Sequence, residues 1–174
     1  MDVTYIKKTL SSAHEELVSG ISGNFADVRG IDQASTCISG LLSNAERKNG
    51  WQLAEAMGYQ TPYSIQQFMY RGNWNEDDVR DDLREYVKVN LGTTEATLVI
   101  DETGFLKQGK KSAGVKRQYS GTAGRVENCQ VGVFLTYAYP NGFAMIDRKL
   151  YLPENWAKDK ERRKGARIPD DVEL

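Results

Sequence analysis

The chain has 174 residues and a formal net charge of −1, and 40% of its residues are hydrophobic. This length allows one ordinary domain or two small ones, and the composition is that of a globular protein with a real core. No apolar run approaches the roughly 20 residues of a membrane helix, and the N-terminus lacks the apolar segment of a signal peptide. The sequence therefore predicts a cytoplasmic protein without a membrane partner.

Nitrogen and sulfur ligands are scarce. The cysteines Cys37 and Cys129 lie far apart and His14 is the one histidine, so a zinc site with about four close ligands is excluded. A Ser-His-Asp or Cys-His site is excluded too, unless His14 serves in it. Metal chemistry in this chain must use oxygen ligands, which favours Mg²⁺ or Mn²⁺.

Charge is unevenly distributed along the chain. Acidic residues dominate from Asn75 to Glu85, whereas the stretch from Thr103 to Val126 contains none. The latter stretch carries six basic residues, and these are Lys107, Lys110, Lys111, Lys116, Arg117 and Arg125. Such an asymmetry supports a local anion-binding surface on a nearly neutral protein.

The first third of the chain gives mostly helical signals. Apolar residues between Leu10 and Val18 have helical spacing with a stop at Gly20, and Gly20 to Gly30 is interpreted as a loop. A second apolar stripe begins at Ile38. Ser43 and Glu46 have the spacing of a capping box, which predicts a new helix that ends at Gly58.

Two further helices are predicted before residue 92. Thr61 and Pro62 are typical N-cap and first-turn residues of the first, which runs to Gly72. The second begins near Asn75 and has an acidic first turn. The helix pair joined at Gly58 has the length of a helix-turn-helix, whose second helix enters the major groove of DNA. Its candidate DNA contacts are Tyr63, Gln66, Gln67 and Arg71. The alternative is an ordinary helical hairpin.

The pattern changes to strands after Gly92. The run 97–100 predicts a short buried strand, followed by a turn over 101–104. Asp101 at the end of this strand is a candidate metal ligand, and the alternative is that it only caps the turn. Glu102 would point to the opposite face of the strand and is interpreted as structural or solvent-facing.

The remaining sequence predicts a basic, glycine-rich loop and an antiparallel hairpin. The loop is either a phosphate-contacting segment or a solvated connection. Strands are predicted over 130–139 and 143–152 around the turn at 140–142, and a helix is expected to open near Glu154. Trp51, Trp74, Trp156 and Tyr119 are expected to be core or hinge anchors rather than base-stacking platforms.

Together these elements predict a mainly helical region over residues 1–92, which is a candidate for DNA binding, and an α/β or α+β domain over 93–174. A sheet of three strands without a following layer of helices would leave an apolar face uncovered. The second domain is therefore expected to be incomplete.

Several longer motifs resemble the DDE endonucleases of bacterial insertion sequences, which are transposases. The resemblance extends from about Leu41 to the C-terminus. The motifs that carry it are Glu46–Trp51, Leu98–Lys107, Gly114–Gly124, Glu127–Phe134 and Leu150–Trp156. They are more specific than any single short motif.

This resemblance implies an RNase H-like core behind a helical DNA-binding region. Three carboxylates of the family bind two divalent ions that cleave and rejoin DNA at transposon ends, and Asp101 matches the first of them. The second Asp and the final Glu are expected beyond Leu174. Asp147 is expected two strands from Asp101, about 10 Å away, which is too far to share a metal ion. The tail acids Asp170, Asp171 and Glu173 have no predicted position.

Three hypotheses follow. The first is a transposase fragment that binds DNA, is inactive alone, and self-associates or pairs with a complementing transposase chain. The second is a DNA-binding regulator or inhibitor of transposition without catalysis. The third is an interaction fragment or pseudogene product that dimerises or aggregates through an exposed sheet edge.

Overall fold

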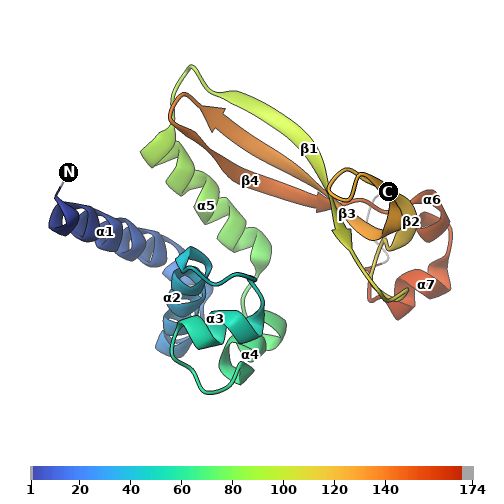
Figure 1. The fold of residues 1–174 in the computed structure, drawn as a ribbon, viewed down its shortest axis with the longest axis horizontal. Helices are drawn as coiled ribbons and strands as arrows, with labels where there is room; N and C mark the ends of the chain where they lie inside the picture. The colour runs from blue at the N-terminus through green and yellow to red at the C-terminus, as the bar shows by residue number, and fades with distance from the viewer. Residues whose placement is uncertain (1, 170–174) are drawn as a thin grey trace. The chain divides into compact units, whose positions relative to one another are not determined.

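The computed structural model describes residues 2–169, and the tail acids Asp170, Asp171 and Glu173 lie outside the described residues. The chain divides into two compact units, residues 1–90 and 91–174. The first is helical, and the second contains a small antiparallel sheet followed by two short helices (Figure 1). None of the described helices is long and apolar enough to cross a membrane.

The helical unit has a core of two adjoining clusters. Its elements are α1 (Val3–Ile21), the 3-10 turn η1 (Ser22–Asn24), α2 (Val28–Leu42), α3 (Gly50–Ala56), α4 (Tyr63–Arg71) and α5 (Glu76–Leu91). One cluster packs Ile21, Ala34 and Phe68, and the other packs Leu53, Ala54 and Ile65; Cys37 contacts both. The clusters lie where α2, α3 and α4 meet, so these helices form a compact three-helix group.

Local capping explains where these helices begin, and it corrects two boundaries. The capping box predicted at Ser43 is wrong, because the Asn49 side chain accepts hydrogen bonds from Trp51 N and Gln52 N and starts α3 at Gly50. The loop predicted up to Gly30 is shorter, because Asp27 caps α2. The predicted start at Asn75 is confirmed: its Oδ1 accepts the Asp77 N–H at 2.8 Å.

The second unit is built around one long central strand. Its strands are β1 (Thr97–Leu106), β2 (Lys116–Ser120), β3 (Arg125–Tyr139) and β4 (Gly142–Leu150), and all pairs are antiparallel. β1 occupies one edge of β3. β2 and β4 lie along the other edge of β3, β2 beside its first residues and β4 beside its later ones. Both must lie opposite β1, because Cys129 pairs with β1 and β2, and residues 132–138 pair with β1 and β4. The helices α6 (Glu154–Ala157) and α7 (Lys160–Gly165) come after the sheet.

Two strand predictions need correction. The stretch Lys116–Ser120 was predicted as part of a loop and is a strand, because it pairs with the first residues of β3. The strand predicted over 97–100 does not end in a turn, because β1 stays paired with β3 as far as Leu106. It is not buried either, since Leu98 and Ile100 are 62% and 74% exposed. The predicted β3–β4 hairpin is confirmed.

Candidate functional site

Asp101 lies in the middle of β1, opposite Phe134 of β3. Its side chain is exposed, and Oδ1 accepts a hydrogen bond from the backbone N–H of Glu102 at 2.8 Å. Residues 101–104 form no turn, because β1 stays paired with β3 as far as Leu106. The alternative prediction, that Asp101 only caps such a turn, is therefore wrong. The carboxylate is therefore carried on a paired strand, which fixes its position better than a loop would.

A polar hollow of about 410 Å³ borders Asp101. Three hydroxyl-bearing residues line it together with the acids of β1 and the residues of the β2–β3 turn. The complete lining is Asp101, Glu102, Thr103, Gly104, Tyr119, Gly121, Thr122 and Val131. This arrangement offers oxygen ligands and hydrogen-bonding groups, which suit a hydrated cation or a sugar-phosphate segment.

The described residues do not complete a metal site. No group of three Asp, Glu, His or Cys residues in this part of the chain could hold an ion. Asp147 of β4 pairs with Leu135 of β3, which in turn pairs with Ile100 of β1. Two strand spacings therefore separate Asp147 from Ile100, the residue next to Asp101. Cross-strand partners share a sheet face, and Asp147 therefore shares the face of Ile100 and not that of Asp101. The two carboxylates cannot bind one ion.

The six predicted phosphate-contacting residues all lie in the second unit, but in different settings. Lys110 and Lys111 are exposed, and no acid in the described part of the chain lies within ion-pair distance of either. Arg125 is paired with Glu127 at 2.8 Å, and Arg117 Nη2 donates to Val126 O at 3.4 Å. Lys116 is exposed on β2 and Lys107 is half-buried at the end of β1. Lys110 and Lys111 are thus two adjacent, exposed cations on the loop between β1 and β2, and Lys116 is a third exposed cation on β2.

The predicted DNA contacts of the helical unit are divided by the orientation of α4. Ile65 and Phe68 are buried. The opposite side of the helix carries Tyr63, Gln67 and Tyr70. Arg71 is exposed at the end of the helix. Gln66 is half-buried and packs against the start of α3, since a Cβ built on Gly50 would lie 2.9 Å from the Gln66 Cγ.

Some exposed aromatic residues correct the expectation that these side chains are core anchors. Trp156 is fully buried and Trp74 half-buried, as expected. Trp51 and Tyr119 are instead 58% and 65% exposed. Tyr70, 80% exposed, was missed, although its spacing of seven residues from Tyr63 is the helical signal that places both on one face.

Comparisons with known proteins match this chain to one family. The family model for the DDE superfamily endonuclease matches residues 28–174. A protein of Microchaete diplosiphon described as "Probable transposase for insertion sequence element IS701" is 31% identical over 145 residues. The match covers 80% of this chain but only 37% of that relative. No solved structure matches. The family match spans both the three-helix group and the sheet that carries Asp101, and the chain belongs to the DDE superfamily endonucleases.

Proposed function

We propose that this chain acts on DNA as part of an insertion-sequence transposase, with Asp101 as the first of the catalytic carboxylates. The observation that carries the proposal is the position of Asp101. It stands on a paired strand beside a polar hollow, in a unit whose basic stretch from Thr103 to Val126 contains no acid. The order β1, β3, β4 across the sheet agrees with the first three long strands of an RNase H-like core.

The described residues around Asp101 supply few ligands for a metal ion. An exposed carboxylate is a suitable ligand for Mg²⁺ or Mn²⁺, but the donor set around Asp101 in the described residues is too small for the metal pair that such an enzyme needs. We therefore propose that these 174 residues do not cleave DNA alone. The other carboxylates would come from further polypeptide, such as a complementing transposase chain.

DNA binding is assigned mainly to the second unit. Residues 1–90 contain nine basic and 13 acidic residues, a net charge of −4, whereas residues 91–174 contain 14 basic and 11 acidic residues, a net charge of +3. Since phosphate attraction supplies most of the affinity for DNA, the sheet unit would provide it. The helical unit would instead contribute base contacts through Tyr63, Gln67 and Arg71 of α4.

A cleavage and binding experiment tests this function. The chain is mixed with plasmid that carries the ends of its own insertion sequence, with Mg²⁺ or Mn²⁺, and cleavage is followed on gels. We expect salt-sensitive DNA binding without cleavage, for the wild type and for Asp101→Asn alike. Cleavage by the wild type that Asp101→Asn abolishes would overturn the proposed inactivity while supporting the role of Asp101. Absence of DNA binding would overturn the function as a whole.

A second function, a DNA-binding regulator of transposition, is favoured by the small donor set around Asp101. The two functions differ in the effect of adding the full transposase. A regulator would compete for the same ends and lower transposition, whereas a complementing part would raise cleavage. Asp101→Asn should leave competition intact and abolish complementation.

A further inference from the structure

The basic loop between β1 and β2, residues 107–115, is held at many points along its backbone. From β3, Asn128 Nδ2 donates to Lys107 O and, at 3.0 Å, to Gly109 O. Gln130 Nε2 donates to Ala113 O at 2.7 Å. Within the loop, Val115 N donates to Ser112 O at 3.1 Å. Loops usually carry mobile backbone, so this density of side-chain donors is unusual for a solvated connection.

The two helices after the sheet hold the other end of the loop. Trp156 of α6 is fully buried, and its Nε1 donates to Val115 O at 2.8 Å. The Arg162 guanidinium of α7 lies 3.9 Å from the centre of the Trp156 ring. Its Nη2 also donates to Val115 O at 3.2 Å and approaches Lys110 O at 3.5 Å. A cation over an indole ring and a shared acceptor join α6, α7 and the loop into one local structure.

The backbone at Gly114 is part of the same arrangement. Its φ of +72° is in the left-handed region, and an added Cβ would lie 2.6 Å from Tyr151 O, just before α6. Only glycine fits there without displacement. The segment that leads into α6 therefore presses directly on the loop.

These contacts leave the lysines as the groups that the loop presents to solvent. Hydrogen bonds from protein side chains are accepted by the carbonyl oxygens of Lys107, Gly109, Ala113 and Val115. These oxygens would repel an anion if they faced it, and the hydrogen bonds direct them toward the protein instead. Lys110 and Lys111 are exposed. Fixing a loop before binding removes the ordering cost that a flexible loop would incur upon binding.

We infer that α6 and α7 form a brace that pre-organises the basic loop for the phosphodiester backbone of DNA, with Trp156 and Arg162 as positioning residues. The inference rests on the proposed function, since it takes DNA as the ligand. Arg162 acts through the loop: its charge lies over the indole ring and against two carbonyl oxygens, whereas Lys110 and Lys111 make the phosphate contacts.

A charge-preserving variant separates positioning from simple attraction. Arg162→Lys keeps the net charge but loses the planar guanidinium that stacks on Trp156 and reaches both carbonyl oxygens. Trp156→Phe keeps an aromatic ring but removes the Nε1 donor. The matched control is Lys164→Ala, which removes a charge from the exposed side of α7 and leaves the brace contacts in place.

The test measures affinity of the whole chain for duplex DNA at several salt concentrations, together with hydrogen exchange of residues 107–115. We expect Arg162→Lys and Trp156→Phe to weaken binding roughly five- to tenfold and to speed exchange in the loop only. The double variant Lys110→Ala, Lys111→Ala should lower the slope of log affinity against log salt by up to about 1.8, which corresponds to two phosphate contacts. Lys164→Ala should leave loop exchange unchanged.

The outcomes distinguish the two proposals. If the wild type binds DNA and Arg162→Lys matches it in affinity and loop exchange, the brace is overturned and the proposed function stands. If the wild type shows no salt-dependent binding, DNA is the wrong ligand and both proposals fall. A variant that loses its cooperative melting transition is replaced by the other, because Arg162 and Trp156 test the same contact from its two sides.

Discussion

Gly104 of β1 lies directly against Ser120, the last residue of β2. A Cβ built on Gly104 would lie 2.4 Å from Ser120 Oγ and 2.9 Å from Ser120 Cβ. Ser120 is 1% exposed and cannot move aside into solvent. The absence of a side chain at position 104 therefore allows the β2–β3 turn to approach β1, and this approach forms one wall of the hollow beside Asp101.

Gly104→Ala is accordingly expected to destabilise the second unit by about 1–3 kcal/mol, since overpacking forces backbone shifts. The free energy of unfolding in urea measures the loss. Gly121→Ala is the matched control, because a Cβ there would meet nothing within 4 Å. Equal stability of the two variants would contradict the close approach of β1 and the turn.

How far the sequence predicts this fold depends on the range of each signal. The start of α5 and the β3–β4 hairpin follow from local residues such as Asn75 and Gly142, and both predictions are confirmed. β2 was missed because its strand character comes from pairing with β3 rather than from its own charged residues. Gly104 was interpreted as a turn residue, whereas it serves a contact with a residue 16 positions away.

The candidate site divides in the same way. The separation of Asp101 from Asp147 follows from the resemblance to an RNase H-like sheet, and the register bears out this order of the strands. The local pattern placed Asp101 at the end of a strand, whereas it lies in the middle of β1. The contact between Trp156 and Val115 spans 41 residues, and no local pattern encodes it. The sequence therefore predicts the charges of the basic loop but not the long-range contacts that hold its backbone.

The outward side of α4 provides a test of base recognition. Replacement of Tyr63 and Tyr70 by Ala should lower the preference for end DNA over unrelated DNA by about tenfold, within the roughly 1–3 kcal/mol of a good base contact. The measurement is the ratio of the two dissociation constants at one salt concentration. Gln66→Ala should change stability and leave this ratio unchanged, because Gln66 packs against Gly50. An unchanged ratio in the tyrosine variant would exclude Tyr63 and Tyr70 as residues that contact the bases.

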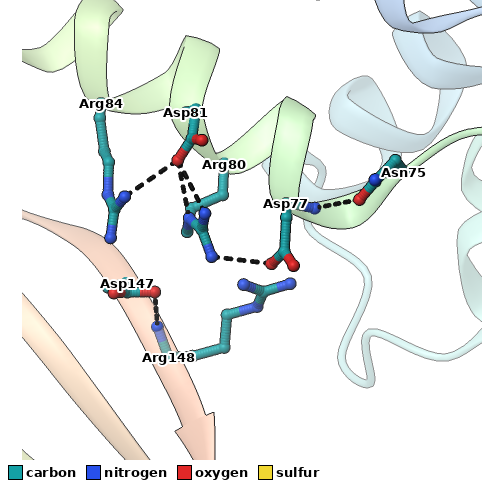
Figure 2. Close-up of polar contacts among 7 residues, drawn as sticks. All are labelled: Asn75, Asp77, Arg80, Asp81, Arg84, Asp147 and Arg148. Atoms are coloured by element: carbon teal, nitrogen blue, oxygen red, sulfur yellow. Dashed lines mark hydrogen bonds and ion pairs between the residues drawn. The ribbon is translucent and has the colours of Figure 1, made fainter. Parts of the chain in front are cut away.

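The arginine pairs of α5 predict a small dependence of stability on pH. Arg80 donates to Asp77 and, through Nε and Nη2, to Asp81, and Arg84 donates to Asp81 at 2.9 Å (Figure 2). The hydrogen bond from Arg80, followed by the charges of Arg80 and Arg84, lowers the pKa of Asp81. A lowered folded-state pKa gives stability that is present above the unfolded pKa and is lost as pH falls through the folded one.

Melting temperature should therefore fall more steeply with acid for the wild type than for Asp81→Asn, in the range below about pH 4. Because the Asp81 side chain is exposed, the difference should be small and should shrink in salt. Asp78→Asn removes an equal charge from the same helix outside this arginine pair and controls for net charge. Parallel curves for the wild type and Asp81→Asn would show that the pairs contribute nothing in solution.

The outer edge of β1 predicts self-association. No strand in the described part of the chain pairs with this edge, and the apolar residues Leu98 and Ile100 are exposed beside it. An exposed, apolar edge strand is a template for pairing with another chain. The wild type should gain mass with concentration in sedimentation experiments, and Ile100→Lys should prevent this. Val3→Lys, at a similarly exposed position on α1, is the control.

The two acids of β1 provide the opposite test. Asp101 and Glu102 are the only charges between Thr97 and Leu106, and they lie halfway along the strand. A symmetric antiparallel pair of β1 strands centred there would place these like charges opposite each other, which is destabilising. Glu102→Gln should therefore strengthen association, whereas Ile100→Lys weakens it. If Glu102→Gln leaves the mass unchanged, the contact between copies does not use this edge, and another exposed apolar surface must account for it.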